Sequence, residues 1–183
     1  VCSSDLPGLS FMLATIAHFG EEGYLDYWQA LVENQVVVTS DWETAYYTNF
    51  SASSGRGPQP MVVSYASSPA AELIYAEEPL DEAPTASIVS PNACWRQVEF
   101  AGILKGTSKR LMAQKFIDFL LSIEFQEDVP LQMFVYPVHP QATLPTEFVQ
   151  ATQIPQQPAS LDPALIAQNR ETWIEDWTEL VLK

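Results

Sequence analysis

Apolar side chains recur at helical spacing along several stretches of this chain. Near the start they are Leu9, Met12, Leu13 and Ile16. These positions share one face of a helix over residues 9–19, which Gly20 then ends. The same reasoning predicts helices over residues 24–33, 42–50, 108–121, 123–128 and 162–182. For the helix over 108–121 we expect an inward-facing set made of Leu111, Phe116, Phe119 and Leu120.

Short apolar runs between these helices are typical of buried strands. They lie at residues 36–38, 61–63 and 97–104. Residues 136–138 are expected to be extended, because Pro137 keeps Tyr136 out of helical geometry. The remaining stretches are rich in proline, glycine, serine or glutamine and predict surface connections at 51–60, 77–91 and 140–158. Strands that alternate with helices in this way predict an α/β fold.

The run from Met61 to Pro69 joins one predicted strand to the start of a helix. Ser67, Ser68 and Pro69 suit a first helical turn, because serine is a favoured N-cap and proline fits the first position. Open α/β sheets place ligands where the carboxyl ends of strands face helix amino ends. Tyr65 and the two hydroxyls therefore predict a pocket here, although packing alone would also explain the segment.

Charge and length limit the classes of function that this chain can have. The chain has 183 residues, which is room for one sizeable domain or two small lobes. It carries 23 acidic residues against 8 basic ones, a net charge of -15, so it lacks the basic surface that nucleic acid requires. A cationic ligand would instead meet a favourable field. No apolar stretch is long enough to cross a bilayer.

Catalytic motifs are missing from the sequence. It has no nucleophile elbow, phosphate-binding glycine loop or zinc-protease pair, and its histidines, His18 and His139, lie far apart. Cys2 and Cys94 offer no metal-ligand spacing. We therefore expect no catalytic residue, metal site or cofactor. A hydrolase or transferase that uses Glu72 or His139 is the alternative from a different class.

Aromatic residues near predicted helix starts and strand ends are the stronger signal. They are Trp42, Tyr46, Tyr47, Tyr65, Phe134 and Tyr136. Aromatic faces hold flat heterocycles by stacking and cations through the ring quadrupole. The adjacent Tyr46 and Tyr47 permit a second hypothesis, a ferric-iron carrier with phenolate ligands. By contrast, Trp173 and Trp177 share a helix face with Leu180, and we expect that face to pack against the body of the protein.

Several segments, taken together and in order, resemble one family over nearly all of residues 7–183. They are Pro7-Gly-Leu9, Trp42-Glu-Thr-Ala-Tyr46, Ser64-Tyr-Ala-Ser-Ser-Pro69, Gln97-Val-Glu99, Phe116-Ile-Asp-Phe119, Tyr136-Pro-Val138 and Asn169-Arg-Glu-Thr-Trp-Ile-Glu-Asp-Trp177. In these segments the chain resembles the thiamine-binding subgroup of ABC-transporter solute-binding proteins. That resemblance implies the two-lobed type II periplasmic-binding fold, an α/β architecture.

The resemblance also implies a ligand site. In the family, aromatic side chains grip the aminopyrimidine and thiazolium rings, and the matching positions here are Trp42, Tyr65 and Phe134. The full set we expect to contact ligand is Trp42, Tyr46, Tyr65, Ser67, Ser68, Phe134 and Tyr136. Two family positions differ, because a ligand-binding serine falls at Leu6 and a tyrosine falls at Ala71.

Family members run to roughly twice this length, in keeping with two-lobed proteins. The resemblance implies that residues 7–95 form most of the second lobe, and that 96–183 cross the hinge and close the first lobe. Residues 1–6 are expected to be a non-native leader. The implied function is capture of thiamine or its phosphate esters outside the cytoplasm, in the periplasm or on a lipid anchor. The implied partner is an ABC permease, with no nucleic acid, and the full-length protein is expected to be a monomer.

Overall fold

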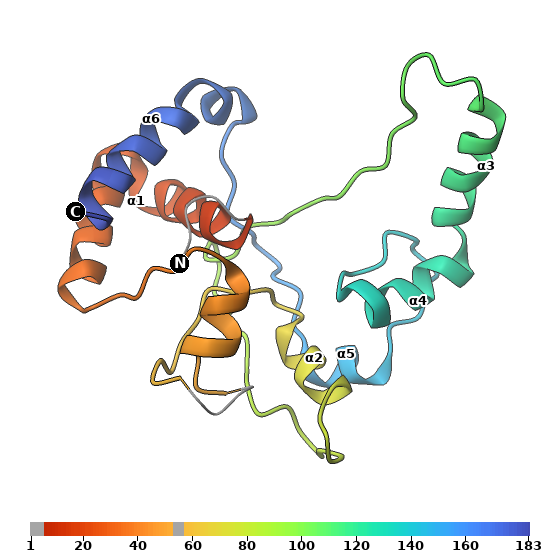
Figure 1. Ribbon diagram of the computed structural model, residues 1–183, viewed down its shortest axis with the longest axis horizontal. Helices are drawn as coiled ribbons and strands as arrows, with labels where there is room; N and C mark the ends of the chain where they lie inside the picture. The colour runs from red at the N-terminus through yellow and green to blue at the C-terminus, as the bar shows by residue number, and fades with distance from the viewer. Residues whose placement is uncertain (1–5, 53–56) are drawn as a thin grey trace. The chain divides into compact units, whose positions relative to one another are not determined.

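The computed structural model describes residues 6–52 and 57–183 (Figure 1). Its helices are α1 (Leu6–Glu33), the π-helix η1 (Thr44–Asn49), α2 (Ser68–Ile74), α3 (Arg110–Leu120), α4 (Ile123–Met133), α5 (Thr146–Ala151) and α6 (Pro163–Val181). Of the expected leader at residues 1–6, only Leu6 lies within the described residues, and it begins α1. None of the described helices combines the length and apolar content needed to cross a bilayer.

The chain divides into two compact units, each assembled from segments that are distant in sequence. The first unit contains Val1–Tyr65, Ile88–Arg96 and Ile154–Lys183. The second contains Ala66–Ser87 and Gln97–Gln153.

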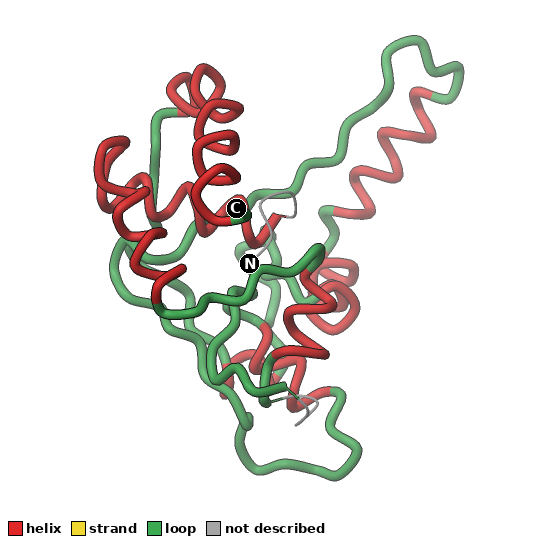
Figure 2. Tube along the Cα trace, turned by 60° about the vertical axis from the view of Figure 1, so that its left-hand side comes forward, coloured by secondary structure: helices red, strands yellow, loops and turns green. Residues whose placement is uncertain are grey.

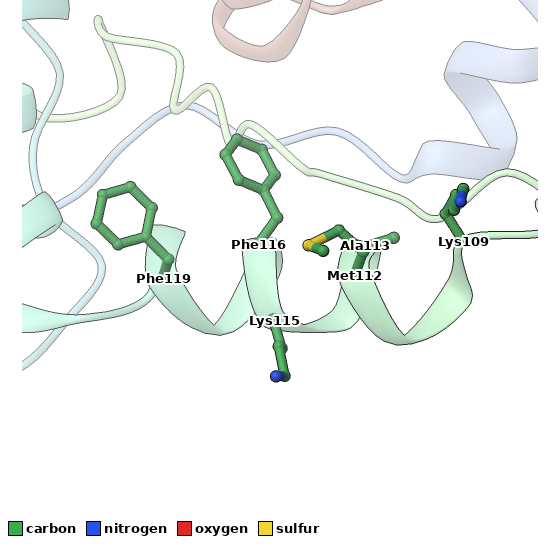
Figure 3. Close-up of a pocket in the computed structure, with 6 residues that line it drawn as sticks. All are labelled: Lys109, Met112, Ala113, Lys115, Phe116 and Phe119. Carbon is green, nitrogen blue, oxygen red and sulfur yellow. The ribbon is translucent and has the colours of Figure 1, made fainter.

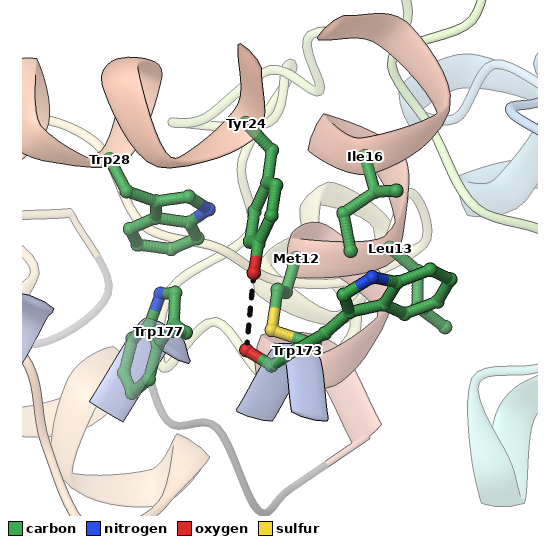
Figure 4. Packing of buried hydrophobic residues seen from close by; sticks show 7 residues of the cluster. All are labelled: Met12, Leu13, Ile16, Tyr24, Trp28, Trp173 and Trp177. Atoms are coloured by element: carbon green, nitrogen blue, oxygen red, sulfur yellow. Dashed lines mark hydrogen bonds between the residues drawn. The ribbon is translucent and has the colours of Figure 1, made fainter. Parts of the chain in front are cut away.

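Helices α1 and α6 pack together to form the core of the first unit (Figure 4). Its buried side chains are Met12, Leu13, Ile16, Tyr24, Trp28, Trp173 and Trp177. The Trp28 and Trp177 rings meet edge to face, with centroids 5.3 Å apart. Trp173 and Trp177 are 3% and 1% exposed, which confirms that their helix face packs against the body of the protein.

Helix α1 contains a break that the sequence predicted. The pattern indicated two helices separated at Gly20, and Gly20 has φ 77° and ψ 172° inside the continuous span. That backbone conformation is open almost only to glycine. The break lets the two halves of α1 bring Ile16 and Tyr24 into the same cluster (Figure 4).

The second unit is held by the packing of α2 against α5, with Ala70 and Phe148 fully buried. The Gln126 side chain, on α4, links three parts of this unit. Its amide nitrogen donates to the Leu120 carbonyl at 2.7 Å, and its amide oxygen accepts from the Val138 N–H at 2.7 Å. The segment after α4 is therefore tied to α4 itself and to the end of α3.

The strand predictions are not met. Across the described ranges there is no β-strand, only two isolated bridges, Phe50 with Gln59 and Trp95 with Ala159. The runs expected as strands at 36–38, 61–63 and 97–104 are irregular chain, drawn as loops in Figure 2. Their side chains suit strands, but a strand also needs a neighbour to satisfy its N–H and C=O groups. An α/β sheet is consequently not formed within the described residues.

The prediction that one set of α3 side chains is buried is also wrong for most of that set. The helix forms almost as predicted, but Leu111, Phe116 and Phe119 are 78%, 59% and 52% exposed. Only Leu120 of that set is half-buried. The reason is that α3 packs mainly against α4, so most of its apolar face is not covered by another helix.

Candidate ligand-binding site

An aromatic cluster in the first unit brings together three of the predicted site residues. The Trp42 and Tyr46 rings are stacked, with centroids 5.0 Å apart and an interplanar angle of 27°. The Tyr65 ring lies 6.0 Å from Trp42 at a tilt of 59°. Tyr47 meets the Trp42 ring edge-on at 5.5 Å. Three tyrosine rings from this part of the chain thus contact the Trp42 indole.

Local hydrogen bonds explain why the chain turns into a helix at Trp42. The Asp41 carboxylate accepts from the Thr44 N–H at 2.7 Å and from the Ser40 hydroxyl at 2.5 Å. These hydrogen bonds hold the pKa of Asp41 below its ordinary value, and the bond from Ser40 has the largest effect. The carboxylate therefore stays ionised next to Trp42 in the sequence, at the positive end of the helical turn.

The turn that follows is a π-helix rather than the α-helix predicted over 42–50. The Phe50 N–H bonds the Ala45 carbonyl at 3.0 Å, five residues back. Such widened turns are rare and are found frequently at functional sites. Here the turn lets Tyr46 and Tyr47 both contact the ring of Trp42.

The side chains of the cluster differ in accessibility. Tyr46 is only 4% exposed and packs against Phe50 as well as Trp42. Trp42 is half-buried, whereas Tyr47 and Tyr65 are 53% and 42% exposed. A ligand can therefore reach Trp42, Tyr47 and Tyr65, while Tyr46 lies behind the indole.

A single hydrogen bond fixes the Trp42 ring in its plane. Its Nε1–H donates to the Ser64 hydroxyl oxygen at 2.9 Å. Ser64 directly precedes Tyr65, so this bond ties the irregular segment 61–65 to the helical turn that carries Trp42. Sequence reasoning did not single out Ser64 by itself.

The predicted serines lie in the second unit, at the start of α2. The helix begins at Ser68 with Pro69 in its first turn, as predicted. The Ser67 carbonyl accepts from the N–H groups of Ala70 and Ala71. The Ser67 side chain is 4% exposed and makes no capping hydrogen bond, while Ser68 is half-buried.

Phe134 and Tyr136 also lie in the second unit, just after α4. Phe134 ends α4 in a left-handed conformation, with φ 55°, and its ring lies 5.3 Å from that of Tyr75. Tyr136 packs edge-on against buried Phe148 at 5.7 Å, and burial raises the pKa of its hydroxyl. Tyr136 therefore contributes its ring to the core of this unit.

Sequence reasoning missed Tyr75, which is 70% exposed beside Phe134. The signal was present: the family tyrosine falls at Ala71, and Tyr75 follows four residues later, one helical turn along α2.

Two hollows lie outside these aromatic groups. One, of about 500 Å³, is lined by Lys109, Met112, Ala113, Lys115, Phe116 and Phe119. Figure 3 shows Phe116 and Phe119 along one side of α3, with Lys115 pointing away from them. The other, of about 420 Å³, lies between residues 81–87 and the end of α5. Neither contains a predicted site residue.

Comparison with known proteins decides the family. A family model described as "Bacterial extracellular solute-binding protein" matches residues 4–169. The chain belongs to this family. Within the described residues, no group of three or more His, Cys, Asp or Glu side chains is placed to hold a metal ion. No solved structure matches the chain.

Curated relatives of this solute-binding chain carry the name "Thiamine-binding periplasmic protein". The protein of Escherichia coli K12 is 31% identical over 178 residues, 97% of this chain and 51% of its own length. That of Salmonella typhimurium LT2 is 30% identical over the same shares of both chains. That of Brucella suis is 28% identical over 93% of this chain and 48% of its own length. The chain thus spans about half the length of the relatives it matches.

Proposed function

We propose that this chain is part of the solute-binding component of an ABC importer that captures thiamine or its phosphate esters. The observation that carries the proposal is the Trp42 cluster, an indole backed by Tyr46 and flanked by Tyr65. The proposal is also supported by membership of a solute-binding family and by relatives named for thiamine binding. The protein acts as a carrier that makes and breaks no bond, and it delivers its ligand to a membrane permease.

The cluster suits the chemistry of thiamine. The vitamin joins a flat aminopyrimidine to a positively charged thiazolium, and aromatic rings attract both. A cation over an indole or phenol face contributes about 0.5–2 kcal/mol. The ionised Asp41 and the net charge of -15 favour the same positive charge.

The proposed contacts extend beyond this cluster. On the strength of the family resemblance we assign ligand contacts also to Ser67, Ser68, Phe134 and Tyr136. The pairing of Phe134 with exposed Tyr75 supports the assignment of Phe134, because it offers accessible aromatic surface beside that ring.

For the fold, we propose the two-lobed type II architecture, with residues 7–95 in the second lobe and 96–183 closing the first. Two findings support it. The predicted strands have no strand partner among the described residues, and Phe100 and Leu104 are 90% and 83% exposed. The apolar face of α3 is similarly exposed. The exposed apolar run suits a strand of a larger sheet, and the exposed face of α3 suits a helix that packs on such a sheet. We place the protein outside the cytoplasm, with or without a lipid anchor, and expect the full-length form to be a monomer.

The test is a titration of the purified protein with thiamine, thiamine monophosphate and thiamine diphosphate, followed by tryptophan fluorescence and calorimetry. We expect saturable quenching by at least one of them. Trp42→Ala should weaken binding about 5- to 150-fold, because loss of one stacking ring costs about 1–3 kcal/mol. Phe116→Ala, at an exposed ring outside the cluster, is the matched control and should bind normally. No response to any of the three ligands would reject the proposal.

The ferric-iron alternative gains no support from the geometry. The Tyr46 and Tyr47 rings meet edge-on at 5.4 Å, and Tyr46 is buried behind Trp42. The comparisons favour thiamine over both iron and a hydrolytic or transfer reaction.

A further inference from the structure

The two faces of the Trp42 indole are not equivalent. Tyr46 stacks on one of them at 5.0 Å, and Tyr46 is itself 4% exposed. A ligand ring cannot occupy that face without displacing a buried tyrosine. A flat ligand that stacks on the indole without displacing Tyr46 must therefore use the opposite face.

An indole on a surface helix turns about two side-chain bonds, so stacking on Tyr46 alone does not fix its direction. The hydrogen bond from Trp42 Nε1–H to the Ser64 hydroxyl, at 2.9 Å, adds a restraint in the plane of the ring. The two residues are 22 positions apart, so the restraint is tertiary rather than local. Together the two contacts determine both the plane of the indole and its rotation within that plane.

We propose that Ser64 is a positioning residue for the ligand. Its hydroxyl holds Trp42 flat on Tyr46, so that only the far face of the indole is offered to a planar cation. Because Ser64 directly precedes Tyr65, the same bond also sets the distance between the indole and the Tyr65 ring. This inference rests on the proposed function, since it assumes that Trp42 stacks on the ligand.

The first test needs no ligand. The indole N–H of Trp42 gives one cross-peak in a proton–nitrogen spectrum, and Trp42→Phe identifies it by its loss. In the wild type this N–H should exchange slowly with solvent. In Ser64→Ala it should exchange faster, while Ser64→Thr, which keeps the hydroxyl, should restore protection. Equal exchange in the wild type and Ser64→Ala would overturn the proposal.

The second test is a double-mutant cycle on thiamine affinity. Ser64→Ala should weaken binding about three- to tenfold, in line with the loss of one neutral hydrogen bond. Ser64→Thr should recover most of that loss. Ser87→Ala removes a different serine hydroxyl, one that donates to the Ala66 carbonyl at 3.1 Å, and should leave affinity unchanged.

The Trp42→Phe background gives the decisive comparison. Phenylalanine keeps a ring but has no N–H, so Ser64→Ala should cost nothing further in this background. An equal loss in both backgrounds would mean that Ser64 acts on the ligand or the fold directly, and it would overturn the positioning role. If the wild type binds no thiamine, the proposed function fails, and the exchange experiment still decides whether the Ser64 hydroxyl holds the Trp42 ring.

Discussion

Tyr24 illustrates how a single buried hydroxyl makes stability depend on pH. Its side chain is 1% exposed, and its hydroxyl donates to the Trp173 carbonyl at 3.5 Å (Figure 4). Burial, then the charges of Asp176 and Glu21, raises the pKa of Tyr24 from 10.0 to about 12. The folded state therefore holds this proton more tightly than the unfolded state does.

The sign of the effect follows from proton binding. Below pH 10 both states keep the proton and the stabilisation is complete, but between pH 10 and about 12 only the folded state keeps it. We therefore expect the free energy of unfolding, measured with urea, to fall through this window. Tyr24→Phe should flatten the fall, because it removes the titrating group and keeps the ring. Tyr47→Phe, at an exposed tyrosine, should leave the profile as it is. An unchanged profile in Tyr24→Phe would contradict this account.

At the level of single residues, the sequence singled out two rings that the structure brings together, and their contact with a ligand stays a prediction. Trp42 and Tyr65 stood out because aromatic rings at helix starts and strand ends are unusual, and the structure places them 6.0 Å apart. The hydrogen bond of Ser64 could not be predicted, since it depends on how the 21 residues between Trp42 and Ser64 fold back. The backing role of Tyr46 depends on a π-helical turn where the sequence predicted an α-helix. Tyr75 was missed because it lies four residues after Ala71, where the family tyrosine falls, and only the helical turn of α2 relates the two positions.

Among the helices, the break in α1 offers a clean comparison of two glycines. Gly20 has φ 77°, and a Cβ added there would meet no atom within 4 Å. The cost of Gly20→Ala is consequently backbone strain alone, about 1–3 kcal/mol of the free energy of unfolding. Gly23 lies in the following helical turn, where an added Cβ would contact that of Phe19 at 3.4 Å.

Gly23→Ala should therefore behave oppositely. At a helical position, alanine stabilises the folded state by about 0.5–1 kcal/mol relative to glycine, because the unfolded chain then has less conformational entropy to lose. Urea denaturation of the two variants should show Gly20→Ala less stable than the wild type and Gly23→Ala as stable or more stable. If the two variants lose stability equally, the positive φ of Gly20 is not the cause of the loss.

The periodicity that predicts elements could not predict their partners. The helices predicted over 9–19, 24–33 and 162–182 are confirmed. Their apolar faces meet within one unit, in the cluster around Trp28 and Trp177. The run at 97–104 has suitable side chains, but pairing a strand depends on chain that is distant in sequence. For the same reason α3 has the predicted helical period but not the predicted burial.

At the scale of the whole molecule, charge is distributed unevenly along the chain. Four of the 8 basic residues lie between positions 105 and 115, a stretch without any acidic residue; they are Lys105, Lys109, Arg110 and Lys115. The rest of the chain holds all 23 acidic residues against the remaining 4 basic ones. Outside that stretch the field is therefore strongly negative, and a cation approaching the Trp42 cluster is attracted before any contact forms.

This field predicts a salt-dependent association rate for thiamine. Raising the salt from about 0.01 M to about 0.3 M shortens the screening length several-fold, so the rate constant measured by stopped flow should fall. Thiochrome, a neutral oxidation product of thiamine, should associate at a rate that salt hardly alters. Thiamine diphosphate, with a net negative charge, should associate faster as salt rises. If all three ligands respond to salt alike, the acidic surface plays no part in capture, and stacking on Trp42 alone must account for selection of a cation.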